Sequence, residues 1–330
     1  MRFGKYLFRN ILRDEAILPP YKGSTFRGAF GVALKRVVCA VRRDDCVACL
    51  LASRCIYART FELVQNEPDR KMRLAAPPHP YVIQPPLSRA THFNTGDTFD
   101  FTLLLFGEAN DFLPYFVYAF ETMGEIGIGK KIGNRRSAFV LTSVEQDGVN
   151  IYTGETKRLL PALEKTLSLV PHSEDPQEGT LTINFLTPLR LKFDNHLQAQ
   201  LPFHLLVRAA LRRISSLFAY YGAGEPALDY RGMVKRAEAI TVERADLRWY
   251  DWERYSNRQD QAMLMGGMAG SITYRGAIGE YLPLLELARE LHIGKQTSFG
   301  LGMFDFTWGT CAGSHARGPV RIPRSEEPLL

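Results

Sequence analysis

The order of apolar patterns along the second half of the chain constrains the fold more than any other feature. Residues 181–193 alternate apolar and polar side chains for most of their length, as a half-buried strand does. Helical spacing of apolar residues begins after Pro202 and returns after two long stretches rich in Ile, Val, Tyr and Trp. The order strand–helix–strand–strand–helix–strand is the ferredoxin-like split motif. The expected elements are strands at 181–193, 237–250, 262–275 and 299–307 and helices at 202–221 and 278–291.

The first half of the chain repeats this plan. In both halves the second helix runs into a glycine- and lysine-rich turn, at 127–136 and 294–302, and then into the last strand. The same order of helix, glycine-rich turn and strand in both halves indicates an internal duplication. The expected elements are strands near 3–9, 79–85, 98–107 and 137–145 and helices near 25–39 and 111–125.

The sequence therefore predicts an α+β protein with tandem ferredoxin-like (βαββαβ) domains and a Cys-rich insertion in the first. The N-terminal domain is expected at 1–150, with the cysteines at 39–55, and the C-terminal domain at 180–309. A linker at 151–179, with a short strand and helix within 149–168, would join them. Residues 310–330 combine Gly, Pro, Ser and mixed charge, which is typical of a loose tail.

Basic residues gather at the start of the chain. The net charge is +6, yet residues 1–60 alone hold twelve Lys and Arg against four Asp and Glu. Such clustering is the electrostatic mark of a polyanion partner, although a solvated basic face without a partner is an equal alternative. The chain has no apolar stretch long enough for a membrane helix and no apolar segment of a signal peptide at its start. We expect a cytoplasmic protein without membrane contact.

The two glycine-rich turns are candidates for holding phosphate. Glycine permits positive φ and close approach of another backbone, and exposed N–H groups in such a turn suit phosphate oxygens. Neither turn is a Walker A loop, because each leads into a strand. A tight helix-to-strand connection is the structural alternative. The residues expected at phosphate are Gly294, Lys295, Thr297, Ser298 and Gly300 in the second turn and Lys130, Lys131, Arg135 and Arg136 in the first.

Two further stretches could contact RNA. His204, Arg208 and Arg212 fall at i, i+4 and i+8 on one face of the helix expected at 202–221. The aromatic and basic residues within 244–258 are suited to stacking bases and contacting phosphates. A polar helix face and an exposed hairpin are the corresponding structural alternatives.

Four cysteines, Cys39, Cys46, Cys49 and Cys55, follow the first helix closely in sequence. Cytosolic proteins rarely form disulfides, so four local thiols predict a structural zinc ion with tetrahedral coordination. An iron–sulfur cluster uses the same ligands and stays open as an alternative. A set of small buried apolar residues is the third possibility.

The pattern Gly-x5-Gly-Leu-Gly at 294–302 resembles the signature of the RAMP superfamily of CRISPR-associated proteins. The stretch Leu-Pro-Pro-Tyr-Lys-Gly-Ser-Thr-Phe-Arg-Gly at 18–28 is similar to the start of the same proteins, with the basic residue Arg27 before a glycine. Within that superfamily the chain is most similar to the endoribonucleases that process pre-crRNA.

The resemblance implies cleavage of CRISPR repeat RNA without a metal cofactor, by attack of a ribose 2′-hydroxyl that leaves a 2′,3′-cyclic phosphate. It also implies RNA contact by Arg27, and possible partners among other CRISPR-associated proteins. These enzymes often use a histidine just after the first helix, but the first histidine of this chain is His79. The remaining catalytic candidates are His292, Tyr21 and Lys35. A non-catalytic RAMP subunit that binds crRNA in an effector complex is the alternative function.

Overall fold

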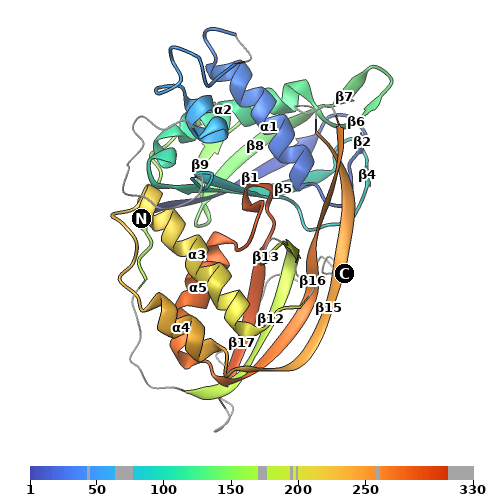
Figure 1. Cartoon of the computed structure of the whole chain (residues 1–330). Helices are drawn as coiled ribbons and strands as arrows, with labels where there is room; N and C mark the ends of the chain where they lie inside the picture. Colours follow the sequence, from blue (N-terminus) through green and yellow to red (C-terminus); the bar gives the residue numbers. More distant parts are fainter. Residues whose placement is uncertain are drawn as a thin grey trace. The chain divides into compact units, whose positions relative to one another are not determined.

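The computed structural model describes residues 1–42, 45–63, 77–169, 177–193, 196–197, 200–256 and 261–310 (Figure 1). Two compact units make up the chain. The first comprises Met1–Leu167 with Ser216–Gly224, and the second Ser168–Ser215 with Glu225–Leu330. Among the residues that the structure describes, no helix combines the length and the apolar character needed to cross a membrane.

The first unit is built on an antiparallel sheet in the order β10-β9-β8-β1-β5-β3, with β11 pairing with β1. The chain order is strand–helix–strand–strand–helix–strand, followed by three added strands. These elements are β1 (Arg2–Leu12), α1 (Gly23–Val38), β3 (Tyr81–Gln84), β5 (Thr98–Phe106), α2 (Leu113–Ile126), β8 (Phe139–Gln146), β9 (Val149–Thr153), β10 (Arg158–Leu159) and β11 (Lys165–Thr166).

Two small ribbons and two short turns complete the first unit. Strand β2 (Ala16–Ile17) pairs with β4 (His92–Phe93), and β6 (Ile128–Ile132) pairs with β7 (Arg135–Ser137). The short turns are a π-helical turn at Ala58–Glu62 and a 3₁₀ turn at Gly107–Phe112.

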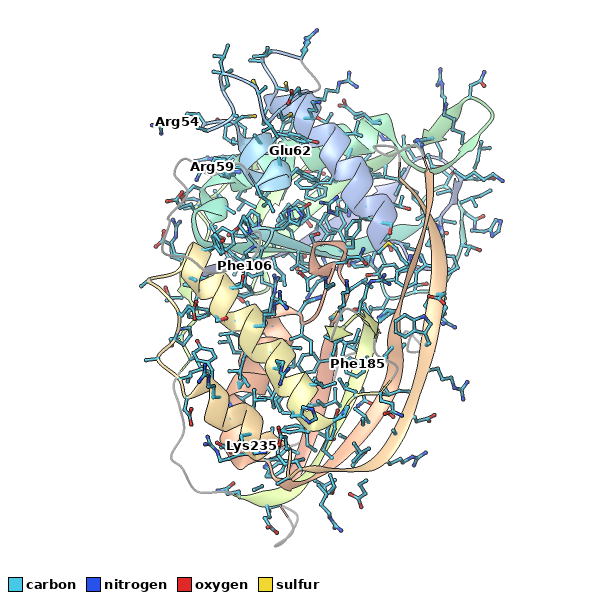
Figure 2. The ribbon with its side chains drawn as sticks, in the orientation of Figure 1. Arg54, Arg59, Glu62, Phe106, Phe185 and Lys235 are labelled. Carbon is cyan, nitrogen blue, oxygen red and sulfur yellow. The ribbon has the colours of Figure 1, made fainter. Side chains whose placement is uncertain are left out.

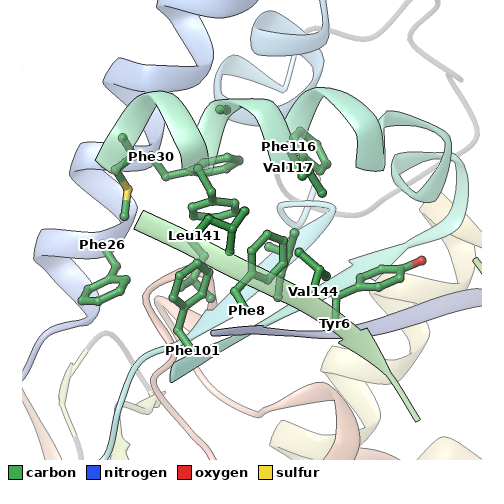
Figure 3. Packing of buried hydrophobic residues seen from close by; sticks show 14 of the residues in the cluster. Tyr6, Phe8, Phe26, Phe30, Phe101, Phe116, Val117, Leu141 and Val144 are labelled. Atoms are coloured by element: carbon green, nitrogen blue, oxygen red, sulfur yellow. The ribbon is translucent and has the colours of Figure 1, made fainter. Parts of the chain in front are cut away.

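Aromatic side chains fill the core of the first unit, between the sheet and the helices α1 and α2 (Figure 3). Phe30 of α1 stacks on Phe120 of α2 with ring centroids 4.5 Å apart, and Phe8 of β1 lies 4.8 Å from the same ring. Burial of each such ring contributes about 2–3 kcal/mol. The apolar faces of α1 and α2 therefore fix both helices on the sheet.

The second unit has the same order of elements around a sheet with the strand order β15-β16-β12-β17, again antiparallel. Its main elements are β12 (Glu178–Leu189), α3 (Phe203–Tyr221, which belongs to this unit up to Ser215), α4 (Tyr230–Ala237), β15 (Thr241–Ser256), β16 (Gln261–Ala277), α5 (Leu282–Leu291) and β17 (Phe304–Thr310). Strand β13 (Lys192–Phe193) pairs with β14 (His196–Leu197), and Gly279–Tyr281 and Thr297–Phe299 form 3₁₀ turns.

The prediction of a mixed α/β chain with antiparallel strand pairing is confirmed, but some details were wrong. No helix occurs within 149–168; these residues form β9, β10 and β11, which pair with one another or with β1 and β8. The expected boundary at 150 and the linker at 151–179 therefore divide a sheet. Helix α4 was not predicted, and residues 311–330 of the expected tail lie outside the described residues.

Candidate nucleic-acid interface and catalytic residues

The glycine-rich segment 294–302 follows α5 and is fastened to the end of β12. Gly294, Gly300 and Gly302 have φ values of +85°, +83° and +74°, which an L-residue adopts only with strain. A Cβ on Gly302 would lie 1.8 Å from the carbonyl oxygen of Ile293. The hydroxyl of Thr187 donates to the carbonyl of Gly300 over 2.7 Å and accepts from the N–H of Met303 over 2.9 Å.

Several backbone N–H groups of this segment already donate hydrogen bonds to carbonyl groups of the protein itself. The N–H of Lys295 donates to the carbonyl of Arg190 over 2.8 Å, and that of Gly302 to the carbonyl of Pro188 over 3.0 Å. The N–H groups of Phe299 and Gly300 close turns within the segment. Thr297 and Ser298 are buried, at 8% and 3% exposure, whereas Lys295 is exposed. The expectation that backbone N–H groups and both hydroxyls present a phosphate site is therefore corrected to a structural role, with Lys295 left as an exposed cation.

His292 ends α5 and has no exposed surface. One ring nitrogen, Nδ1, lies 3.0 Å from the carbonyl oxygen of Leu301. A carbonyl only accepts, so Nδ1 carries the proton and donates. A fully buried ring does not reach an RNA phosphate in this conformation. The acid–base role predicted for His292 is corrected: the ring joins the end of α5 to the far end of the glycine-rich segment.

Tyr21 and Lys35 do not form one site either. Tyr21 is 3% exposed just before α1, and burial raises the pKa of its phenol well above the usual value. Lys35 lies near the opposite end of α1, about 18 Å further along at 1.5 Å per residue. Its Nζ atom is 5.7 Å from the centroid of the Tyr57 ring. These two catalytic candidates are therefore separated by most of a helix.

The first glycine-rich turn is a different structure from the second. It forms the hairpin β6–β7, in which Lys130, Lys131, Arg135 and Arg136 are all exposed. Gly133 stands at its tip with a φ of +62°. The guanidinium of Arg136 donates to the carbonyl of Gly129, which ties one cation to the base of the hairpin. The hairpin therefore presents four cations at the surface of the first unit.

Arg27 and His79 lie together in the first unit, an association that sequence spacing did not reveal. Nη2 of Arg27 is 3.3 Å from Nε2 of His79, and Nδ1 of His79 is 3.0 Å from the carbonyl oxygen of Thr60. The guanidinium also lies 5.1 Å from the centroid of Phe61. Because the Thr60 carbonyl only accepts, His79 carries its proton on Nδ1 and accepts from Arg27 at Nε2. Both side chains are half-buried, so neither is sealed in the core.

In the second unit, the row on α3 keeps its predicted order, with Arg208 and Arg212 exposed and His204 half-buried. The carboxylate of Glu238 offsets part of the positive charge of this row. The pKa of Glu238 is lowered by a hydrogen bond from Lys235, then by the charges of Lys235, His204 and Arg208. On β15, the ring of Tyr250 lies 5.6 Å from that of Trp252 in a tilted pair. The described part of the ribbon β15–β16 thus carries an aromatic pair next to the exposed Arg248.

The four cysteines of the first unit line one pocket, together with Asp45, Ala52, Tyr57 and Ala58. None forms a disulfide, and each is half-buried. Figure 2 labels Arg54, which lies between Cys49 and Cys55, and Arg59 and Glu62 of the turn that follows the cysteines. Among the residues that the structure describes, no group of three or more His, Cys, Asp and Glu side chains is arranged to hold a metal ion.

Two family models match the chain. Residues 1–164 match a model described as an N-terminal domain, and residues 183–304 match the model for the CRISPR-associated endoribonuclease Cas6. The chain is 26% identical over 298 residues to an uncharacterized protein of Archaeoglobus fulgidus, covering 87% of this chain and 92% of that protein.

Solved Cas6 structures share the fold. A Thermus thermophilus Cas6 in a product complex gives a TM-score of 0.53 at 16% identity, over 92% of this chain and 98% of that one. A partial Cas6-RT-Cas1–Cas2 complex gives 0.54 at 14% identity, over 95% of this chain and 47% of that one. The chain is therefore similar in fold to Cas6 structures, and its residues 183–304 match the model of the CRISPR-associated endoribonuclease Cas6.

Proposed function

We propose that the protein is an endoribonuclease that cleaves CRISPR repeat RNA in pre-crRNA to give crRNA. The match of residues 183–304 to the Cas6 endoribonuclease model carries this proposal. That stretch runs from within β12 to the first residue of β17 and so covers most of the main elements of the second unit. The product complex of the Thermus Cas6 adds support for RNA as the ligand of this fold, and the Cas6-RT-Cas1–Cas2 complex for other CRISPR-associated proteins as partners.

The shared order of elements in the two units supports the tandem ferredoxin-like arrangement that we propose for the whole chain. The strand orders β8-β1-β5-β3 and β17-β12-β16-β15 are the same when each strand is counted within its own unit. A duplicated frame gives two sheets on which RNA-binding side chains can be arranged. We place the protein in the cytoplasm, where CRISPR transcripts are made.

Exposed cations supply the attraction for RNA in this proposal. The hairpin β6–β7 offers Lys130, Lys131, Arg135 and Arg136, and the glycine-rich segment of the second unit offers Lys295. Such side chains neutralise phosphates regardless of sequence and make the affinity depend on salt. The aromatic pair Tyr250 and Trp252 is suited to stacking unpaired bases.

For the chemical step we propose the pair His79 and Arg27 as base and cation. His79 takes the 2′-hydroxyl proton, and the 2′-oxygen attacks the adjacent phosphorus. The bond from phosphorus to the 5′-oxygen breaks, the 5′-oxygen takes a proton from water, and a 2′,3′-cyclic phosphate remains. This step needs a base and a cation near the developing charge, but no metal. The carbonyl of Thr60 fixes the ring with the proton on Nδ1, and Nε2 accepts from Arg27. In this proposal the RNA phosphate draws the Arg27 guanidinium away, which frees the lone pair of Nε2 to take the 2′-hydroxyl proton.

The alternative is a RAMP subunit that binds crRNA without cleaving it. Burial of His292 and Tyr21 favours this alternative, because two of the three catalytic residues expected from the sequence are enclosed. The two functions differ in the fate of the RNA rather than in the surface that binds it.

Incubation of the full chain with the repeat RNA of its own CRISPR locus, in EDTA, tests the proposal. We expect cleavage at one position, with a 2′,3′-cyclic phosphate identified by mass spectrometry and a 5′-hydroxyl. An RNA with a 2′-deoxy nucleotide at that position should bind equally and stay intact, since the nucleophile is missing. Tight binding of the unmodified RNA without any cleavage would instead establish the crRNA-binding subunit.

The base is tested by His79→Ala under single-turnover conditions. We expect the cleavage rate to fall by about 10²–10⁴-fold with the RNA affinity retained, because general acid–base catalysis contributes about that factor. His92→Ala is the matched control, since His92 is an exposed histidine of the same unit on β4. Added imidazole should restore part of the rate of His79→Gly. A wild-type enzyme that cleaves, with His79→Ala equally fast, would remove His79 from the site and leave the proposed function intact.

A further inference from the structure

In the loop after α1, large aliphatic side chains are exposed and the cysteines are half-buried, which is the reverse of the usual arrangement for aliphatic residues. Between Cys39 and Cys55 the aliphatic side chains of Val47 and Leu50 point outward, with 71% and 84% exposure. The cysteines, in contrast, are half-buried and face a common pocket. Among the described residues between Cys39 and Cys55, only Ala52 is buried. A loop ordered by the hydrophobic effect would place Val and Leu inside, so burial of apolar area does not explain this arrangement.

The end of α1 and local hydrogen bonds turn the chain near each of the cysteines that line the pocket. Cys39 caps the end of α1 in an extended conformation, so the chain leaves the helix at the first thiol. A carboxylate oxygen of Asp45 accepts from the N–H groups of Val47 and Ala48, both at 3.1 Å, which turns the chain around Cys46. The N–H of Ala52 donates to the carbonyl of Cys49 over 2.9 Å, and the N–H of Cys55 to that of Leu51 over 2.8 Å. All four thiols belong to one unit and one pocket.

The side chains that line the pocket include the donor set of a structural zinc site. All four cysteines border it, and thiolate sulfur is a preferred ligand of zinc. A zinc ion deprotonates each thiol that it takes as a ligand.

We propose that Cys39, Cys46, Cys49 and Cys55 bind one structural zinc ion that cross-links the end of α1 to the loop and to the turn at Ala58–Glu62. Binding replaces four S–H bonds by four Zn–S bonds and releases four protons. The sulfur atoms are not in coordination geometry in the described conformation, so rotation about their Cα–Cβ bonds has to bring them together. Zinc sites commonly couple binding to local ordering in this way. Four thiolates leave no open position for substrate, so the ion itself takes no part in the chemical step.

Metal analysis of the full chain, purified under reducing conditions without an affinity tag that binds metal, tests the proposal. We expect one zinc per chain, and replacement by Co²⁺ should give the visible absorption of tetrahedral thiolate coordination. Protein with neither zinc nor stoichiometric uptake of added Zn²⁺ would overturn the proposal. Bound iron with a visible charge-transfer band would overturn it in favour of an iron–sulfur cluster.

Single substitutions identify the ligands. Cys46→Ser and Cys49→Ser should each lose most of the bound zinc, whereas Cys311→Ser, the substitution of the fifth cysteine, should keep it all. Zinc retained by both loop variants would overturn the assignment. Because a loop variant can fail to fold, wild-type protein serves as a second readout: a chelator should release the zinc and expose four additional thiols to a thiol reagent. Release of zinc without newly reactive thiols would equally contradict the site.

Discussion

His292 and the glycines that follow it show how a residue pattern can be right while its interpretation is wrong. The pattern picks out a segment with left-handed backbone at Gly294, Gly300 and Gly302. Yet backbone N–H groups of this segment donate to the carbonyl groups of Arg190 and Pro188 and to carbonyl groups within the segment. His292 is fully buried. Glycine is needed because other backbone lies against it: a Cβ on Gly294 would be 2.6 Å from the carbonyl oxygen of Arg190. The motif therefore marks the way in which the second unit folds.

At the residue scale we predict that Gly302→Ala destabilises the chain more than Gly133→Ala. Both glycines have positive φ, which costs alanine about 1–2 kcal/mol. At Gly133 a Cβ meets nothing within 4 Å, whereas at Gly302 it meets a carbonyl oxygen at 1.8 Å. We expect a total cost of about 2–5 kcal/mol at Gly302, since crowding adds to the backbone term. Urea unfolding midpoints of the two variants measure the difference, and equal midpoints would refute the packing argument.

The hairpin β6–β7 illustrates what is decided at the scale of an element. Its two strands are short, and Ile132 near the tip is 44% exposed, so the hairpin does not serve the core of the first unit. Gly129 packs against the carbonyl of Ile17 on β2 and fixes the base of the hairpin, while the cations project outward. A short, charged, exposed hairpin is suited to contact with an anionic partner.

The prediction at this scale concerns salt dependence. Lys130→Ala with Lys131→Ala should weaken RNA binding and reduce the slope of log K against log salt by about 0.7 for each phosphate that is no longer neutralised. The control is Lys157→Ala with Arg158→Ala, which removes the same charge from exposed residues of the same unit. Affinities at several salt concentrations separate the two. An equal change of slope in both variants would show that net charge, rather than the hairpin, controls binding.

At the scale of the whole molecule, the two units share one order of elements but use it differently. In the first unit the turn after the second helix extends into an exposed hairpin, and in the second unit it folds back on β12. The first unit has three added strands, β9, β10 and β11, and the second has the added helix α4. Two units with one order of elements and different turns are consistent with RNA held by several elements and cleaved at one, as the proposed function requires.

The sequence by itself determined the order of the main helices and strands. Apolar periodicity of 3.6 or 2 residues records which face of each element is buried, and this information is local. The alternation in β12 and the helical spacing in α3 were therefore readable, as were the cysteines as a group. Helix α4 was missed because it is short and mostly polar, and β10 and β11 because two-residue strands have no period.

Only the tertiary structure decided which of the chosen residues act together. Burial of His292 and the contact of Arg27 with His79 depend on residues far apart in sequence. The hydrogen-bond partners of backbone N–H groups are equally non-local. The N–H groups of Lys295 and Gly302 donate to the carbonyl groups of Arg190 and Pro188, more than a hundred residues earlier in the chain. A motif states which backbone conformations a segment needs, and only the surrounding fold determines whether its polar groups face a ligand or the protein itself.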